Sequence, residues 1–552
     1  MITKFKASLF FLILTVFGAT AQQKPIANKN LNPPVACPKL VVGLVIDQMR
    51  WDYLYRYQNL YSSGGFKRLL SQGYSFENTM VPFTPTYTAP GHTGIYTGSV
   101  PAIHGIVGNN WFDKNTNRSV YCTDDSTVTS VGSTTVAGKM SPVNMWANTI
   151  TDELRLSTNF KSKVIGISLK DRGAILPAGH SGNAAYWYDD AVGKFITSSY
   201  YMKALPAWVD KFNVQDLPAA YMTKDWNTLY PLDKYVLSSA DNMAYEIPLS
   251  GETAPVFPHK VSSIVNGKYA AFKYTPYANT YSFDFAKAVI ENEQLGASTA
   301  TDFLTLSISS TDYIGHSFGP NSIEMEDTYY RLDRDIATFL SYMDAKLGKG
   351  NYLVFLSADH GVAHIPAFLK QHNMPGGYFD EGPVIRELNA SLASEFGVNN
   401  IIQSSMNYQL YLNTNEVEKN GKDLAAIKKI IIKKLKAQPY IVNAFETEKI
   451  YETTLEHTQQ TMMANGYNPA RSGDIMFTVK PGYFDGSGRG TTHGLWNPYD
   501  AHIPNVWFGW NIRPGKSNRE TYMTDIAPTL AALLKIQMPN GSVGKVLEEI
   551  VK

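Results

Sequence analysis

Cysteine is almost absent from this sequence, which has 2 cysteines among 552 residues. Cys37 and Cys122 can form at most one disulfide, so the fold cannot depend on a disulfide framework. Neither cysteine has the spacing of a metal ligand. The sequence leaves open whether the two thiols pair.

An excess of charge of either sign is also missing. The 49 basic and 48 acidic residues give a formal net charge of +1. A nucleic-acid-binding domain is typically strongly basic, with lysine and arginine gathered on one face. The sequence therefore predicts no nucleic-acid partner.

Long apolar runs are missing as well, except for a short one near the start. Lys4 and Lys6 precede an apolar run from Leu9 to Phe17, and Ala19-Thr20-Ala21 follows. This is the pattern of a secretory signal peptide, and the run is too short to span a bilayer. We expect residues 1–21 to be removed and the mature protein to be exported, with the periplasm as its compartment and without a membrane span. A retained N-terminal anchor is the alternative.

The length and the 44% hydrophobic content favour one large domain with insertions. Residues 22–38 are rich in proline, asparagine and glutamine, which predicts a mobile leader before a domain over 39–552. Two regions interrupt its regular pattern, near 184–281 and 399–486. We expect both to form a cap over the edge of the central sheet.

Four apolar runs predict strands that are buried on both faces, as in a parallel sheet. They cover Lys39–Ile46, Val164–Leu169, Phe303–Ile308 and Tyr352–Leu356. Amphipathic segments over 142–156, 323–347, 422–436 and 524–536 predict helices between and after them. The pattern indicates an α/β fold. Polar residues follow each strand, and ligands of open parallel sheets bind beyond the strands' carboxyl ends, so we expect one shared site.

Acidic and imidazole side chains occur at the ends of these strands. In Asp312-x-x-x-His316 the two side chains lie one helical turn apart and can bind one ion, whereas neighbours such as Asp359 and His360 can converge at a turn. Each of these residues alone could be a helix cap or a structural histidine. Two groups of three are typical of a catalytic zinc pair with open positions, which stabilises the attacking and departing oxygens of an in-line displacement. The six candidates are Asp47, Asp312, His316, Asp359, His360 and His493.

A hydroxyl residue stands at the start of another predicted helix. Thr88 lies two positions before Pro90, so we expect it to cap a helix that begins near Pro90. Free N–H groups and the positive end of the helix dipole favour an anion there. Thr88 would face a phosphate bound at this end, although an ordinary capping role is the simpler interpretation.

The order Asp, Thr, Asp-x-x-x-His, Asp-His, His resembles that of the alkaline phosphatase superfamily. Within it, the strings Thr88–His92, Gly108–Trp111 and Ser168–Gly173 are similar to those of PafA-type periplasmic phosphate monoesterases. The resemblance implies an alkaline-phosphatase-like fold with a central, mostly parallel sheet flanked by helices. It also implies two Zn²⁺ ions, one bound by Asp47, Thr88, Asp359 and His360, and the other by Asp312, His316 and His493.

The same resemblance implies the chemistry. Thr88 would be the nucleophile that forms a phosphothreonine intermediate, while Asn109, Lys170 and Arg172 bind the oxygens of a small phosphate monoester. Lys170 and Arg172 are two positions apart, so in an extended segment they would lie on one face. Their two positive charges suit a dianionic monoester.

Some relatives differ in ways that leave alternatives open. We find no carboxylates for a third, Mg²⁺ site and predict none. Nucleotide pyrophosphatase/phosphodiesterases share the threonine, the asparagine and the zinc ligands, so a diesterase is the main alternative, although Lys170 and Arg172 would overcharge a diester site. An inert binding protein that retains the fold is a further alternative. Aspartate and histidine ligands could also hold manganese or iron. We expect a monomer.

Overall fold

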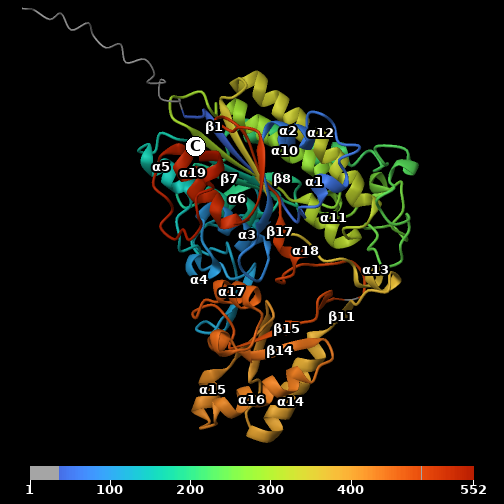
Figure 1. Ribbon diagram of the computed structural model, residues 1–552, viewed down its shortest axis with the longest axis vertical. Helices are drawn as coiled ribbons and strands as arrows, with labels where there is room; N and C mark the ends of the chain where they lie inside the picture. Colours follow the sequence, from blue (N-terminus) through green and yellow to red (C-terminus); the bar gives the residue numbers. More distant parts are fainter. Residues whose placement is uncertain (1–36, 487, 552) are drawn as a thin grey trace, which may run out of the picture. The chain divides into compact units, whose positions relative to one another are not determined.

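The computed structural model describes residues 37–486 and 488–551 (Figure 1). The expected signal peptide and residues 22–36 of the expected leader lie outside the described residues. Within the described part of the chain, no helix is both long enough and apolar enough to cross a bilayer. Cys37 is exposed and Cys122 is buried, and both are free thiols.

An 11-stranded sheet forms the centre of the fold. Its middle is parallel, with β1 (Leu40–Ile46) between β9 (Asp302–Ile308) and β10 (Tyr352–Ser357). All residues of these three strands are buried, because helices cover both faces. The four predicted strands and the α/β fold are confirmed. The remaining strands are β2 (Tyr74–Met80), β5 (Ser130–Val131), β6 (Val164–Ser168), β7 (Ala184–Asp189), β8 (Lys194–Ser198), β17 (His502–Ile503), β18 (Asn505–Gly509) and β19 (Gly515–Tyr522).

Helices pack on both faces of this sheet (Figure 1). On one side lie α3 (Thr88–Thr97), α5 (Ile150–Ser157), α6 (Asp171–Ala178) and α19 (Ile526–Leu534), which contact one another. On the other side lie α2 (Phe66–Gln72), α10 (Tyr277–Asn292), α11 (Ser310–Phe318) and α12 (Ile323–Leu347). Because the middle strands are parallel, their carboxyl ends meet at one edge of the sheet, between the two layers of helices.

The predicted helices differ in how well their limits match. α12 has the predicted limits, and the last predicted helix is a 3-10 turn, η5 (Met523–Asp525), followed by α19. The helix predicted over 142–156 begins only at Ile150. Thr149 stops it there, because its hydroxyl accepts a hydrogen bond from the Asp152 N–H while the Asp152 carboxylate accepts one from the Thr149 N–H.

The structure corrects the interpretation of 184–281 as an insertion outside the sheet. Its first part forms β7 and β8, which extend the central sheet from β6. Tyr186, Trp187 and Tyr188 of β7 are buried. Aromatic residues favour strands, and here they belong to the core and not to a surface cap.

The segment 399–486 contains a separate four-stranded antiparallel sheet in the order β12-β13-β15-β14. Its strands are β12 (Ile402–Met406), β13 (Gln409–Leu412), β14 (Ile441–Glu446) and β15 (Ile475–Val479). Helices α14 (Glu381–Phe396) and α16 (Leu424–Lys436) pack against it around a hydrophobic cluster of their own.

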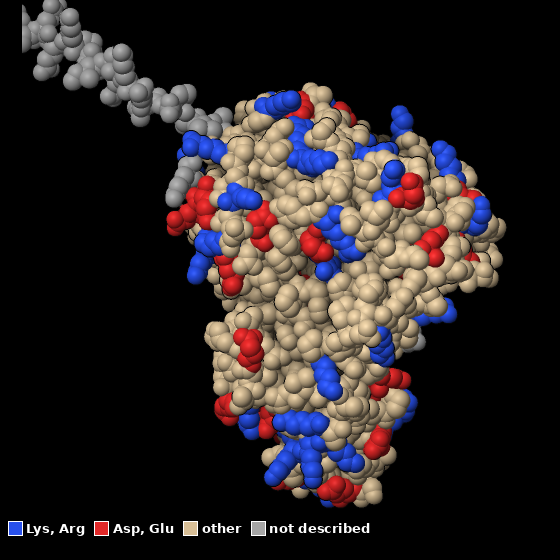
Figure 2. Space-filling model, turned by 45° about the vertical axis from the view of Figure 1, so that its right-hand side comes forward, with Lys and Arg blue, Asp and Glu red and all other residues tan. Residues whose placement is uncertain are grey.

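On the face shown in Figure 2, basic and acidic side chains are interspersed, with a group of basic side chains at the lower end.

A buried histidine ties the segment before α10 to α12. The ring of His259 is fully buried; its Nδ1 lies 2.9 Å from Glu252 Oε2 and its Nε2 lies 3.2 Å from Glu324 Oε1. Burial alone would lower the pKa of His259, but the hydrogen bonds to the two carboxylates outweigh it and raise the pKa to about 9.

We expect this pair of contacts to make stability fall at alkaline pH. A histidine whose pKa is raised in the folded state stabilises it fully below the unfolded pKa of about 6.5, and the contribution is lost as pH rises through about 9. The loss is on the order of 3 kcal/mol in the free energy of unfolding. Urea unfolding at several pH values measures it. His259→Gln should flatten the decline, whereas the exposed His457→Gln should not; equal slopes in all three proteins would contradict the assignment.

Candidate functional site

Six predicted ligand side chains converge at the carboxyl edge of the sheet. Asp47 directly follows β1, and Asp312 and His316 lie in α11 after β9. Asp359 and His360 follow β10 after one intervening residue. The late loop that precedes α18 (Pro498–Ala501) adds His493. Their short separations follow from this topology, because each strand delivers its last residues to the same edge.

Two overlapping groups of these side chains could hold metal ions. In Asp47, Asp359 and His360, one ligand atom from each residue lies within 4.8 Å of the others, and the same holds for Asp312, His360 and His493. The imidazoles of His360 and His493 stack with centroids 3.5 Å apart. His360 thus belongs to both groups, whereas the predicted assignment used it only in the first.

His316 lies beside the second group, which is Asp312, His360 and His493. Its Nε2 lies 3.2 Å from Asp312 Oδ1, and the same Asp312 oxygen lies 3.5 Å from His493 Nε2. A hydrogen bond between His316 Nδ1 and the carbonyl oxygen of Thr491, 2.8 Å away, fixes the ring. Such a contact leaves Nε2 as the ligand atom and is typical of metal-binding histidines.

The chemistry of these side chains fits divalent cations. Asp47 Oδ1 and Asp359 Oδ2 are buried and have no hydrogen-bond partner. Burial raises the pKa of Asp47 well above its ordinary value, and repulsion from Asp359 adds to this, so a cation would stabilise the charged form. Burial lowers the pKa of His360 to about 3 and also lowers that of His493. Both rings are therefore in the neutral form that binds metals.

Lys170 places a buried positive charge between the two groups. Its Nζ lies 2.7 Å from Asp47 Oδ2, 2.6 Å from Asp312 Oδ2 and 3.5 Å from Thr88 Oγ1. The ammonium group therefore contacts one carboxylate of each group and the candidate nucleophile.

Thr88 lies beside this cluster, but it does not cap its helix. α3 begins at Thr88 itself, and the capping position belongs to Tyr87, whose backbone is extended. The prediction of Thr88 as the cap is therefore wrong by one position. Because the Thr88 hydroxyl is not used as a cap, it faces the cluster, with Oγ1 3.5 Å from His360 Nε2. Its backbone is held by His92, whose Nδ1 lies 3.0 Å from the Thr88 carbonyl oxygen and 3.3 Å from Asp359 Oδ2.

Asn109 and Arg172 are held differently from each other. The side-chain oxygen of Asn109 accepts a hydrogen bond of 2.9 Å from the Ala89 N–H, which places its amide next to Thr88. Arg172 donates from Nη1 to the Tyr121 hydroxyl at 2.9 Å, and its Nε is buried without a hydrogen-bond partner.

The expected extended segment from Lys170 to Arg172 is not found. β6 ends at Ser168, Lys170 has an extended backbone, and α6 begins at Asp171, so Arg172 lies in the first turn of a helix. A strand that delivers residues to the sheet edge must turn into its crossover helix there, which breaks the period of two.

Sequence reasoning missed Gln48, which links the two groups. Its backbone N–H donates to Asp359 Oδ1 at 3.1 Å and its Nε2 donates to Asp312 Oδ1 at 2.7 Å. The backbone of Gln48 is left-handed, with a φ of 67°, which is uncommon for this residue type. Only its place directly after Asp47 could have indicated a role.

Most of this chain is similar to proteins of known families. A family profile described as type I phosphodiesterase / nucleotide pyrophosphatase matches residues 41–502. Alkaline phosphatase PafA of Elizabethkingia meningoseptica is 49% identical over 98% of this chain and 98% of its own. A protein of Myroides odoratus named calcium-transporting ATPase is 53% identical over 93% of this chain and 95% of its own. A crystal structure of wild-type alkaline phosphatase PafA superposes with a TM-score of 0.92 at 50% identity and covers 94% of this chain and 100% of that one.

Proposed function

This chain belongs to the type I phosphodiesterase / nucleotide pyrophosphatase family, and we propose that it is an exported zinc-dependent alkaline phosphatase that acts through a phosphothreonine intermediate on Thr88. Hydrolysis of phosphate monoesters follows from the similarity to PafA, which is 49% identical over 98% of this chain. One observation supports the residue-level proposal most directly. The Thr88 hydroxyl lies 3.5 Å from both His360 Nε2 and Lys170 Nζ, at the N-terminus of α3.

Two zinc ions would be divided between the six ligand residues, with His360 in the first set and His316 in the second. Asp47, Asp359 and His360 would hold one ion together with Thr88, and Asp312, His316 and His493 would hold the other. When bound, the ions make the Thr88 hydroxyl more acidic and stabilise negative charge on the leaving oxygen. Lys170 contacts a carboxylate of each group, so its position is coupled to both.

The residues of the chain supply the nucleophile and the charge that the substrate needs. Thr88 Oγ loses its proton and attacks phosphorus; the bond from phosphorus to the ester oxygen breaks, and the departing alkoxide takes a proton to become the alcohol. Water then attacks the phosphothreonine from the vacated side and loses a proton, while Thr88 Oγ regains one and inorganic phosphate is released. Asn109, Lys170 and Arg172 stabilise charge on the phosphoryl oxygens, and the positive end of the α3 dipole adds to it.

A diesterase remains the main alternative, because the matched family includes such enzymes by name. Lys170 and Arg172 favour the monoesterase over the diesterase. Their two positive charges match a monoester dianion, which has two negative charges, whereas a diester has one. Both cations are largely buried, so their charges are weakly screened by solvent.

We expect a strong preference for a monoester over the matching diester. The test compares kcat/KM for an aryl phosphate and for its methyl diester on the zinc-loaded protein. Arg172→Ala should lower kcat/KM for the monoester by about 10²-fold and that for the diester much less, because a charge-stabilising donor is lost. The exposed Arg118→Ala is the matched control. A preference of the wild-type protein for the diester would overturn the proposal.

The proposal of export rests on the first residues of the sequence, which are typical of a signal peptide. We propose that the mature chain begins at residue 22 and acts as a monomer in the periplasm. Sequencing the N-terminus of the exported protein tests the first point, and sedimentation tests the second. An uncleaved N-terminus would favour the anchored alternative.

A further inference from the structure

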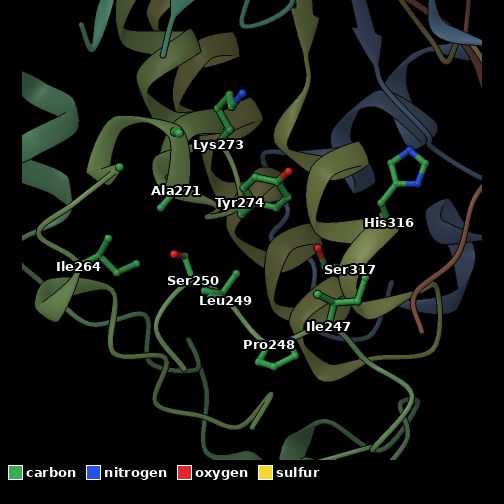
Figure 3. Close-up of a pocket in the computed structure, with 12 residues that line it drawn as sticks. Ile247, Pro248, Leu249, Ser250, Ile264, Ala271, Lys273, Tyr274, His316 and Ser317 are labelled. Atoms are coloured by element: carbon green, nitrogen blue, oxygen red, sulfur yellow. The ribbon is translucent and has the colours of Figure 1, made fainter. Parts of the chain in front are cut away.

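An apolar pocket of about 560 Å³ opens next to the candidate metal centre (Figure 3). In the view of Figure 3, Ile264 and Ala271 line the pocket on the left, Ile247 and Leu249 lie toward the bottom, and Tyr274 and His316 lie above these two. Pockets of this size hold small organic molecules. A phosphate ion alone needs no such apolar volume.

His316 connects the pocket to the centre. Its side chain is 34% exposed, whereas those of His360 and His493 are 0% and 5% exposed. Its Nε2 lies 3.2 Å from Asp312 Oδ1, and the same ring lines the pocket. One side chain thus borders both spaces, so a molecule bound near Asp312 can extend past His316 into the pocket.

The wall of the pocket contacts α11, the helix that carries His316. The Ile247 N–H donates to the Ser317 carbonyl oxygen at 2.9 Å, which ties the loop over 247–250 to α11. On the opposite side, the rings of Tyr274 and Tyr313 are in contact, with centroids 5.2 Å apart. Both contacts involve α11, the helix that carries Asp312 and His316, so the pocket keeps its place relative to the centre.

The lysine that lines the pocket already has an acidic partner. Lys273 forms an ion pair with Asp190, and its ammonium lies 4.9 Å from the centroid of the Tyr313 ring. Lys170 lies 5.1 Å from the same centroid. Lys273 is the only lysine or arginine among the described residues that line the pocket, and it has both a carboxylate and a ring partner, so this lining offers no unpaired lysine or arginine for a second anionic group. The remaining lining favours a neutral, apolar occupant.

We propose that this pocket binds the organic group of the substrate, and that the preferred substrates are phosphate monoesters of aryl or other bulky apolar alcohols. The inference rests on the proposed function, and in it Asp312, His316 and His493 would hold the ion that stabilises the leaving oxygen. The group attached to that oxygen then passes His316, and burying its apolar surface contributes binding free energy.

The test compares phenyl phosphate with 4-phenylphenyl phosphate, whose alcohols have similar acidity, so that the ratio of their kcat/KM values reports contact and not leaving-group chemistry. We take the ratio as kcat/KM for 4-phenylphenyl phosphate divided by kcat/KM for phenyl phosphate. In the wild-type protein this ratio should be greater than one. Ile247→Ser should lower the ratio by about 3- to 10-fold, because it removes an apolar contact from the pocket. Ile247 is 40% exposed, so its replacement spares the core.

Two further variants make the result decisive. Ala271→Phe in α9 (Lys268–Phe272) fills the pocket from another side and should also lower the ratio, by excluding the second ring. Ile103→Ser is the matched control, because Ile103 is 44% exposed and lies in α4 (Pro101–His104), outside the pocket lining. Its ratio should equal that of the wild-type protein.

A binding measurement gives a second readout. Calorimetric titration with 4-phenylbenzylphosphonate, which cannot be hydrolysed in this way, should show a Kd raised about 3- to 10-fold in Ile247→Ser, with methylphosphonate as the small reference. The inference is overturned if the ratio and the Kd stay unchanged in Ile247→Ser and Ala271→Phe, or if Ile103→Ser shifts them equally. The proposed function fails separately, if Thr88→Ala keeps its turnover.

Discussion

Replacing Thr88 with alanine should abolish turnover of an aryl phosphate while the protein stays folded. We expect kcat to fall by at least about 10⁴-fold, since removing a catalytic nucleophile leaves only binding and charge stabilisation. The Thr88 Oγ1 contacts at 3.5 Å with His360 and Lys170 lie at the edge of hydrogen bonding, so their loss costs little stability. Steady-state kinetics measure the loss, and acid quenching followed by mass spectrometry of the wild-type protein should detect phosphothreonine at residue 88.

Two controls separate chemistry from folding. Thr88→Ser keeps a hydroxyl and should retain much of the turnover. Thr97→Ala removes a hydroxyl from the same helix, one that donates to the Thr93 carbonyl oxygen at 2.7 Å and accepts from the Ser99 N–H at 3.1 Å, and should leave kcat nearly unchanged. Zinc content should be similar in all three variants. Normal turnover by Thr88→Ala would end the proposed mechanism.

Removing the metal should have an effect of comparable size. Dialysis against a chelator should lower kcat by more than about 10³-fold, because the charges on nucleophile and leaving oxygen lose their stabilisation. Adding zinc should restore it, with two equivalents bound per chain. Elemental analysis alongside activity measures both.

Variants of single ligands sharpen this experiment. Asp359→Asn removes the charge of a fully buried carboxylate and should lower both zinc content and turnover, whereas Asp233→Asn, at a side chain that is 73% exposed, should change neither. Better restoration by manganese or iron would reassign the metal. Full activity of a metal-free protein would exclude the metal centre.

The sequence predicts the centre of the fold because the strands there are buried on both faces. β1, β9 and β10 are buried along their whole length, so each appears as a predominantly apolar run. The positions of Asp47 and Asp359 then follow, since polar residues directly after such runs must meet at one edge. This is how a set of distant aspartates and histidines could be predicted to share a site.

Other features depend on tertiary contacts and leave little trace in the sequence. The left-handed backbone of Gln48 is held by its bonds to Asp312 and Asp359, and nothing in its neighbours predicts it. Arg172 enters a helix because β6 must turn back toward the sheet, which period-two reasoning missed. The pocket beside His316 combines the helices α9 and α11 with the irregular segment 247–250, whose course no periodicity describes.

The place of β1 in the sheet has a consequence for how the chain is made. Among the described residues, β1 is the first strand to be synthesised, yet both of its neighbours, β9 and β10, come from residues 302–308 and 352–357. Its hydrogen bonds must wait for contacts that are distant in sequence, which slows folding. Most of the polypeptide must therefore be synthesised before the sheet can close. A fragment that stops before residue 352, through truncated translation or proteolysis, would have neither a complete sheet nor a full set of ligands.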